Sequence, residues 1–278
     1  MERMQMPKIS IVMATWNRAG LLAKTIESVR AQTFHDWELI IADDGSTDET
    51  PKIIKEWENR ESRIIYTRSE TNIGISQNYN RAFRMARGSY IAMIDDDDPW
   101  CDAQKLEKEI SFLEKYPDYV GVGGGVIVVN KENKEQYRYL KPETDNAIRS
   151  KMLFSNPMAN STTLFRRAIG EKVGWYDETT RYAGDRDFWL KMGLEGKLYN
   201  FAEYFSYYTL ADQNTSIVRI RPHLKASFMI MRRYKGKYPH YYAAFFINAV
   251  QYAYAFLPVF VRKPIHALLA RLKRKVAG

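Results

Sequence analysis

Residues 91–100 read IAMIDDDDPW, an apolar run followed at once by four adjacent aspartates. The run is typical of a buried strand. Four carboxylates placed together at its end repel one another unless a cation lies among them. In sheets whose strands run mostly parallel, ligands bind beyond the carboxyl ends of the strands. The stretch therefore predicts a buried strand that ends at a functional site.

Strand patterns and helix patterns alternate through the first hundred residues. We expect strands at residues 8–14, 37–42, 63–67 and 89–94, and helices at residues 21–32, 48–60 and 76–86. Ser46 and Glu49 have the spacing of a capping box, which would open the second of these helices. Elements at this pitch predict βαβ units, and hence an α/β protein with a Rossmann-like, mostly parallel sheet flanked by helices.

The following residues continue the pattern less regularly. We expect a helix at 102–116, a strand at 119–130, a polar insertion with one helix at 131–160, a strand near 161–165 and a helix that opens near Asp185. The strand at 119–130 contains GVGGGV, which lacks the spacing and the strand-to-helix context of a dinucleotide-binding loop. We interpret its glycines as places where another backbone approaches closely.

Polar side chains follow three of the first four predicted strands. They are Thr15 and Asn17 after the first strand, Asp43 and Asp44 after the second, and the aspartates 95–98 after the fourth. The carboxyl ends of parallel strands meet at one edge of a sheet, so we expect these side chains to lie close together. Taken alone, the aspartate run could be a solvated loop that caps the next helix. Three polar strand ends at one edge favour a shared site instead.

Asp95 and Asp97 are two residues apart, so both side chains point to the same side if the chain stays extended. Mg²⁺ is typically held by one or two carboxylates together with substrate phosphates and waters. The spacing thus favours a cation that bridges to a diphosphate over a cage of protein ligands. An EF-hand loop is excluded, because the run has no glycine at its sixth position and no glutamate at its twelfth.

Six stretches within the first hundred residues form one continuous pattern. They read ISIVMATWNR at 9–18, AQTF at 31–34, WELIIADDGSTD at 37–48, NIG at 72–74, ARGSYI at 86–91 and DDDD at 95–98. In this order and register, they resemble the family 2 inverting glycosyltransferases with the GT-A fold. The resemblance implies that fold and the use of a nucleotide diphosphate sugar as donor.

The resemblance also implies roles for particular residues. The nucleotide-sugar site would comprise Ala14, Thr15, Asn17, Asp43, Asp44, Asn80, Asp95 and Asp96. Within it, Asp44 with Asp43 beside it would recognise the base. Asp95 and Asp97 correspond to the D-x-D motif that meets the ribose and a Mg²⁺ or Mn²⁺ cofactor. This cation would neutralise the departing diphosphate as a Lewis acid.

An inverting transfer also needs a carboxylate that deprotonates the acceptor hydroxyl. In the family, it comes from an acidic pair that precedes a helix and follows a G-x-x-D-E pattern. Here GWYDE at 174–178 is followed by GDRDFWL at 184–190, so the resemblance makes Asp185 the catalytic base. Gly184 replaces the first acid of the pair, and Asp187 is a competing candidate. Either aspartate could instead serve only as a charge at the N-terminus of a helix.

Two features found in the family are missing from this chain. A histidine that often follows the base helix would fall within 208–212, which read YTLAD, and the Q-x-x-R-W motif of processive polysaccharide synthases is absent. We therefore expect no metal or phosphate contact from 208–212, and the addition of one sugar per encounter.

These features predict an inverting, metal-dependent glycosyltransferase. It would move a single sugar from a nucleotide diphosphate sugar, with UDP as the expected nucleotide, to a saccharide or lipid-linked acceptor in cell-surface polysaccharide biosynthesis. The alternative is a catalytically silent nucleotide-sugar-binding scaffold, which would tolerate the loss of Asp185.

Charge divides the chain unequally. Residues 213–278 contain thirteen Lys and Arg and no acidic residue, whereas residues 1–212 hold the remaining 29 Lys and Arg against all 33 Asp and Glu. The aromatic, basic residues 222–278 could lie on an anionic membrane surface, pack on the body as a helical bundle, or span a membrane at 243–261. We expect the membrane surface as the partner. No nucleic-acid partner is expected, because no such motif is present and an acidic cleft repels a polyanion.

The expected organisation has two parts. A GT-A catalytic domain occupies residues 1–221, with a nucleotide-sugar half up to residue 100 and an acceptor half after it, and a basic aromatic helical tail occupies 222–278. The single cysteine, Cys101, excludes an intramolecular disulfide, and the first apolar run is too short for the core of a signal peptide. We expect a cytoplasmic protein that is peripheral on the inner face of the cell membrane.

Overall fold

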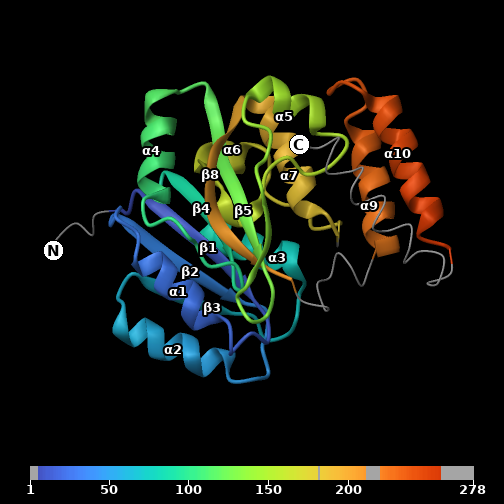
Figure 1. Ribbon diagram of the computed structural model, residues 1–278. Helices are drawn as coiled ribbons and strands as arrows, with labels where there is room; N and C mark the ends of the chain where they lie inside the picture. Colours follow the sequence, from blue (N-terminus) through green and yellow to red (C-terminus); the bar gives the residue numbers. More distant parts are fainter. Residues whose placement is uncertain (1–5, 181, 211–219, 258–278) are drawn as a thin grey trace.

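The computed structural model describes residues 6–180, 182–210 and 220–257. Its centre is an eight-stranded sheet flanked by helices (Figure 1). The strands are β1 (Ile9–Thr15), β2 (Trp37–Asp43), β3 (Ile64–Arg68), β4 (Tyr90–Asp95), β5 (Tyr119–Val129), β6 (Glu135–Tyr139), β7 (Leu164–Arg166) and β8 (Lys197–Thr209). Their order along the sheet is β3, β2, β1, β4, β7, β5, β6, and β8 pairs with β5.

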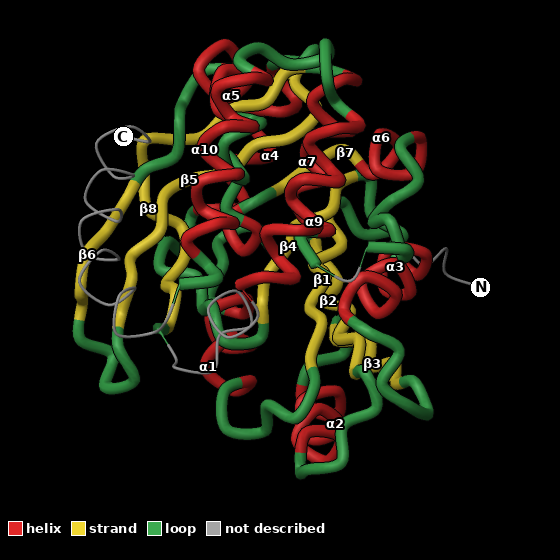
Figure 2. The backbone as a smooth tube through the Cα atoms, turned by 90° about the vertical axis from the view of Figure 1, so that its right-hand side faces the viewer, coloured by secondary structure: helices red, strands yellow, loops and turns green. Residues whose placement is uncertain are grey.

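The sheet is mixed, with its parallel part first in the chain. β3, β2, β1 and β4 run parallel to one another. β7 is antiparallel to β4 and β5, β6 is antiparallel to β5, and β8 is parallel to β5. Figure 2 shows β6, β5 and β8 together at one end of the sheet and β3 at the other. The predicted α/β fold with a mostly parallel sheet is therefore confirmed.

Helices cover both faces of the sheet. One face packs against α1 (Leu22–Arg30), α2 (Thr50–Arg60) and α4 (Lys105–Lys115), and the other packs mainly against α3 (Ile75–Met85) and α7 (Gly184–Glu195). Along β1, Ile11 and Met13 pack in the core on the side of α1, α2 and α4, and Val12 packs in the core on the side of α3 and α7. A strand buried on both faces reads as a continuous apolar run, which is the pattern that the sequence has here.

The register of the central strands brings the polar strand ends together. Thr15 of β1 lies opposite Asp43 of β2, and Ala14 lies opposite Asp95 of β4. The three ends therefore meet at one edge of the sheet, as the sequence predicts.

Two strands and one turn differ from the expectation. β6 lies in the polar insertion and is mostly exposed, and β8 pairs with β5 through bulges, so neither shows a clean apolar alternation. The strand expected near 161–165 is instead a 3₁₀ turn (Asn160–Thr162) followed by the short β7. Two short helices, α5 (Asp145–Lys151) and α6 (Arg167–Lys172), complete this part.

The capping box expected at the start of α2 is wrong. α2 begins at Thr50, whose backbone N–H donates a hydrogen bond to Asp48 Oδ1 at 3.0 Å. The Ser46 hydroxyl instead accepts a hydrogen bond from the Asn17 backbone N–H at 2.8 Å. Ser46 thus joins the loop after β2 to the loop after β1, which holds two of the polar strand ends together.

Two further helices, α9 (Ile220–Arg233) and α10 (Tyr241–Tyr254), pack against each other beside α7 (Figure 1). The Tyr238 hydroxyl, between them, donates to the Leu190 carbonyl of α7 at 2.7 Å. Among the described residues, no helix is long and apolar enough to cross a membrane. The C-terminal helical extension is confirmed, but the domain boundary expected at residue 221 falls inside α9 and stays a prediction. Residues 258–278 of the expected tail lie outside the described residues.

Candidate active site

Asp95, the last residue of β4, is surrounded by hydrogen-bond donors. Its Oδ1 accepts from the Tyr79 hydroxyl at 2.5 Å and from Asn160 Nδ2 at 3.4 Å, and its Oδ2 lies 3.1 Å from the Ser161 hydroxyl. Burial raises the pKa of Asp95, and the hydrogen bonds from Tyr79 and Ser161 oppose this effect. The 3₁₀ turn that replaces the expected strand therefore positions the first aspartate of the run.

The other aspartates of the run form a crowded loop. Asp98 Oδ2 lies 2.8 Å from the same Ser161 hydroxyl, whose single proton cannot serve two carboxylates. Burial and the neighbouring carboxylates raise the pKa of Asp96 to about 7 and raise that of Asp98 as well. Within the described part of the chain, Asp98 Oδ1 is buried without a hydrogen-bond partner. The loop is thus short of positive charge.

Arg18 supplies some of that charge from the loop after β1. Its guanidinium nitrogens lie 3.9 Å from carboxylate oxygens of Asp96 and Asp97. Its backbone N–H donates to Thr50 Oγ1 at 2.9 Å, which ties the loop to α2. A guanidinium has five N–H donors, so these two loose ion pairs leave room for a further anion. Arg18 had no expected role in the site, although its place directly after a strand end marks it in the sequence.

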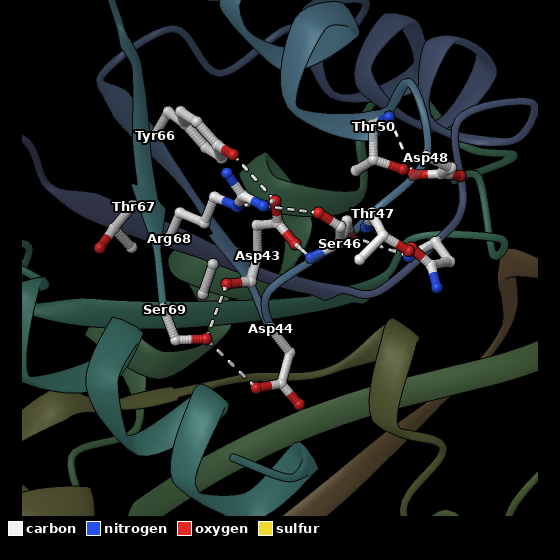
Figure 3. Close-up of polar contacts among 12 residues, drawn as sticks. Asp43, Asp44, Ser46, Thr47, Asp48, Thr50, Tyr66, Thr67, Arg68 and Ser69 are labelled. Atoms are coloured by element: carbon white, nitrogen blue, oxygen red, sulfur yellow. Dashed lines mark hydrogen bonds and ion pairs between the residues drawn. The ribbon is translucent and has the colours of Figure 1, made fainter. Parts of the chain in front are cut away.

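Asp43 and Asp44 point in different directions from the end of β2 (Figure 3). Asp43 is fully buried, and its carboxylate accepts from the Tyr66 hydroxyl and the Ser46 backbone N–H, both at 2.8 Å. Arg68 lies 3.6 Å away as an ion-pair partner. Asp43 therefore fastens the end of β2 to its neighbours.

Asp44 holds the loop that precedes α3. Its Oδ1 accepts from the Ile73 backbone N–H at 2.8 Å and its Oδ2 from the Gly74 N–H at 3.0 Å. A pocket of about 250 Å³ opens at this loop, lined by Asn72, Ile73, Gly74, Ile75, Ser76, Gln77, Glu178 and Thr180. Asp44, which is expected to recognise the base, thus lies behind the part of the pocket wall that Ile73 and Gly74 form.

The end of β1 contributes Ala14, Thr15 and Asn17 to the same edge. Thr15 is buried, and Ala14 is half-buried beside Asp95. Asn17 has a left-handed backbone with φ of 54°, a conformation that asparagine tolerates better than most residues. Its Oδ1 accepts from the Thr47 backbone N–H at 2.8 Å, so its side chain shapes the loop.

Asn80, in α3, is buried. Its Nδ2 donates to the Tyr176 carbonyl at 2.9 Å and to Glu178 Oε1 at 2.8 Å, and its Oδ1 accepts from the Tyr176 N–H at 3.0 Å. The amide is thus used within the protein, where it holds the segment that leads to α7. Its expected contact with the nucleotide sugar stays a prediction.

Asp185, in the first turn of α7, lies close to the aspartate loop. Its negative charge raises the pKa values of Asp95 and of Tyr176. Asn156 Nδ2 donates to Asp185 Oδ2 at 2.8 Å and fixes the carboxylate. Asn156 belongs to the polar insertion, which had no expected role in the site.

Asp187, the competing candidate, faces α9 instead. Its carboxylate accepts from the Tyr234 hydroxyl at 3.0 Å and lies within ion-pair distance of Arg233 (3.6 Å) and Lys191 (3.8 Å). Its side chain is almost completely buried. These contacts give Asp187 a structural task in joining α9 to α7.

A histidine borders the site from an unexpected element. His223 of α9 packs its ring against Tyr182, with ring centroids 4.8 Å apart. Burial lowers its pKa, the charge of Asp185 opposes that change, and its Nε2 is buried without a partner among the described residues. A histidine at this place was expected only within 208–212, whereas His223 comes from α9, later in the chain.

The aspartate loop suits a cation only together with further ligands. Within residues 6–180, 182–210 and 220–257, no group of three or more His, Cys, Asp or Glu side chains could hold a metal by itself. Mg²⁺ commonly takes one or two carboxylates and fills its remaining positions with phosphate oxygens and waters. The unpartnered Asp98 Oδ1 and the crowded carboxylates fit that second arrangement.

A mostly parallel sheet has polar strand ends that meet an acidic loop, and a carboxylate on a helix lies close to that loop. Together these features define a glycosyltransferase of the GT-A fold. The sequence model of glycosyl transferase family 2 matches residues 10–174, more than half of the chain, so the protein belongs to this family. EpsE of Bacillus subtilis (strain 168), which is named as a glycosyltransferase, is 34% identical over 201 residues, which are 71% of each chain.

Solved structures agree with the fold. Mannosyltransferase PcManGT from Pyrobaculum calidifontis, in complex with GDP-Man and Mn²⁺, has a TM-score of 0.64 at 18% identity and covers 97% of this chain and 81% of its own. S. aureus TarS in complex with UDP-GlcNAc has a TM-score of 0.63 at 18% identity, with 81% of this chain and 66% of that chain covered. At these identities, the likeness establishes the GT-A fold and leaves the substrates open.

Proposed function

We propose that this protein transfers one sugar per encounter from a nucleotide diphosphate sugar to a saccharide or lipid-linked acceptor, with inversion at the anomeric carbon. The observation that carries the proposal is the position of Asp185 in the first turn of α7, where its carboxylate accepts from Asn156, in the segment that also brings Asn160 and Ser161 to Asp95. One carboxylate beside the donor site is what a single displacement needs.

The donor would lie at the edge where β1, β2 and β4 end. Asp44 and the pocket at the start of α3 would receive the base, and Arg18 would face the diphosphate. We expect a UDP-sugar first. The structural neighbours bind UDP-GlcNAc and GDP-Man, so both nucleotide classes belong in the test.

Asp97 and Asp95 would hold Mg²⁺ or Mn²⁺ between the loop and the donor phosphates. Asp97 is the more accessible of the two, because its side chain is 19% exposed whereas the Asp95 carboxylate is bonded by Tyr79, Asn160 and Ser161. When bound, the cation supplies Lewis-acid charge for the departing diphosphate.

Asp185 would act as the general base. The acceptor oxygen attacks the anomeric carbon while the bond from that carbon to the diphosphate oxygen breaks, and Asp185 takes the hydroxyl proton. The diphosphate leaves with the electron pair of the broken bond. The hydrogen bond from Asn156 holds the carboxylate in position during this step.

A panel of UDP- and GDP-sugars tests the proposal. Donor binding is measured by thermal shift with and without Mn²⁺, and turnover by the release of nucleotide diphosphate. We expect Asp97→Ala to lower turnover by about a hundredfold or more, because it removes a proposed ligand of the cation that would stabilise the charge of the leaving group. Near-normal turnover of both Asp97→Ala and Asp185→Asn at saturating donor and metal would contradict the mechanism.

The glycine at position 184 is a reason to test a second function as well. A Cβ atom added there would lie 3.0 Å from the Ser76 hydroxyl, so the acid found in the family at this position would crowd α3. A catalytically silent nucleotide-sugar-binding scaffold would bind the donor without turnover across an acceptor panel, and Asp185→Asn would change nothing.

We further propose that the enzyme works on the cytoplasmic side, peripheral to the inner face of the cell membrane, in the assembly of a surface polysaccharide. The basic, aromatic C-terminal region supports this placement, since it would bring the site close to a lipid-linked acceptor.

A further inference from the structure

The outward face of α10 is apolar, although that face is open to solvent. Tyr242, Phe246 and Val250 are 75%, 69% and 47% exposed. They recur four residues apart, so they form one row along the helix. Phe256 and Leu257 extend exposed apolar surface past the end of α10. We call Tyr242, Phe246 and Val250 the outer row.

The opposite face of α10 already makes the packing contacts of the helix. Phe245 and Tyr252 contact Phe228 of α9, with ring centroids 5.4 and 5.8 Å apart. Asn248 is buried on this side and donates to the Ala244 carbonyl at 2.8 Å. α10 thus buries a polar amide, Asn248, and exposes the apolar outer row, which is the reverse of the usual arrangement in a surface helix. The helix lies on the far side of α9 from the sheet (Figure 1).

Cations border the outer row. The Lys235 ammonium lies 5.6 Å from the ring centroid of Tyr242, and the Arg221 guanidinium lies 4.5 Å from that of Phe256. Lys225 and Arg232 are exposed on α9. From residue 213 to the end of the sequence there is no aspartate or glutamate to neutralise them.

We propose that the outer row and its flanking cations dock on an anionic lipid bilayer, with α10 lying flat in the interface. Aromatic side chains with cations beside them suit the boundary between headgroups and acyl chains. Each nearby cation adds electrostatic attraction to an anionic leaflet. The inference deepens the proposed function by naming the docking surface and the lipid that it meets.

Charge disfavours the other occupants of this face. A second copy of the chain would present the same cations, and like charges placed together oppose association. Residues 258–278 add six further Lys and Arg and no acid, so they offer no counter-charge either. An anionic surface is the complement that the chain itself lacks.

Vesicle co-sedimentation of the full chain tests the proposal without donor or metal. The vesicles contain phosphatidylcholine with or without phosphatidylglycerol. We expect Phe246→Ser/Val250→Ser to lower the fraction bound to phosphatidylglycerol vesicles by about tenfold or more, because two exposed apolar anchors are lost. The matched control is Met85→Ser/Leu194→Ser, whose apolar side chains are 38% and 46% exposed on α3 and α7 and should not matter.

A charge variant tests the lipid class. Lys235→Glu and added salt should each weaken binding to phosphatidylglycerol vesicles, and vesicles of phosphatidylcholine alone should bind weakly. Unchanged binding of Phe246→Ser/Val250→Ser would overturn the proposal. The proposal would also fail if light scattering showed that the unaltered protein is a dimer and that Phe246→Ser/Val250→Ser is a monomer with unchanged vesicle binding.

The outcome is separable from the proposed transfer reaction. Asp185→Asn should bind vesicles like the unaltered protein, and Phe246→Ser/Val250→Ser should release nucleotide from a soluble donor at the unaltered rate. If Asp185→Asn keeps normal transfer while its vesicle binding is intact, the proposed reaction has failed. If Phe246→Ser/Val250→Ser keeps normal vesicle binding while its transfer is intact, the proposed docking surface has failed.

Discussion

A single hydroxyl group organises the candidate site at the scale of residues. Ser161 contacts both Asp95 and Asp98, and its backbone carbonyl accepts from Trp100 Nε1 at 2.6 Å. The two carboxylates are thereby held together at a cost in electrostatic free energy, which a cation and a diphosphate would offset. Ser161 is thus as much part of the site as the aspartates that it holds.

The raised pKa of Asp96 leads to a prediction about pH and stability. An aspartate ionises near pH 4 in the unfolded chain, whereas Asp96 ionises near pH 7 in the folded protein. The folded state therefore holds the extra proton between these values, and this contribution to stability is lost as pH rises through the window. Asp96→Asn removes the titration. Its free energy of unfolding should fall less steeply between pH 4 and 7, by up to about 1.4 kcal/mol per pH unit.

Urea denaturation at several pH values, without donor or metal, checks this expectation. Asp118→Asn is a suitable control, because Asp118 is an exposed residue paired with Lys197 at the surface. Parallel pH profiles for Asp96→Asn and the unaltered protein would show that Asp96 is not held neutral in the folded state.

The places of some of these residues could be predicted from the sequence, and those of others could not. Asp44, Asp95 and Thr15 were expected at one edge of the sheet because each lies at or just after the end of a strand, and parallel strands end at one edge. Ser161 and Asn156 could not, because they contact aspartates 66 and 29 residues away in the sequence. Only the folded chain brings them to the site.

At the scale of elements, a buried ion pair in α4 lies beneath the aspartate loop. Lys105 Nζ and Glu109 Oε2 are 2.6 Å apart, and both side chains are fully buried. Burial raises the pKa of Glu109 to about 7 and lowers that of Lys105. The Lys105 ammonium lies 4.3 Å from the ring centroid of Trp100, which in turn bonds to Ser161. α4 thus supports the loop from behind.

Breaking this pair should cost more than removing it. We expect Glu109→Leu alone to destabilise the protein by about 3 to 5 kcal/mol, because it leaves the Lys105 ammonium buried without a partner. The double variant Lys105→Met/Glu109→Leu should recover most of that loss. Denaturation midpoints at neutral pH compare the three proteins, and a double variant less stable than the single one would refute the idea.

The elements themselves show where sequence patterns are informative. The strands β1 to β4 were predictable because each contains an apolar run of three or more residues and lies between polar loops. β8 was not, since its bulges against β5 break the alternation that marks a half-buried strand. β6 was not, because an exposed edge strand has little apolar pattern to read.

At the scale of the whole molecule, the parts with opposite charge are joined directly. α7 carries Asp185 in its first turn. In the same turn Asp187 accepts a hydrogen bond from Tyr234, and the Leu190 carbonyl further along the helix accepts one from Tyr238. The helices proposed to meet the membrane are therefore anchored to the helix that carries the proposed base. A docked α10 would hold the acceptor side of the site at a fixed place relative to the bilayer.

Nucleotide release by Asp185→Asn tests the central claim most directly. The variant is compared with Asp118→Asn and the unaltered protein at saturating donor and Mn²⁺, with donor binding followed by thermal shift. The account predicts that Asp185→Asn keeps the thermal shift and loses turnover by about a hundredfold or more, since it removes only the general base. Turnover close to that of the unaltered protein would contradict it.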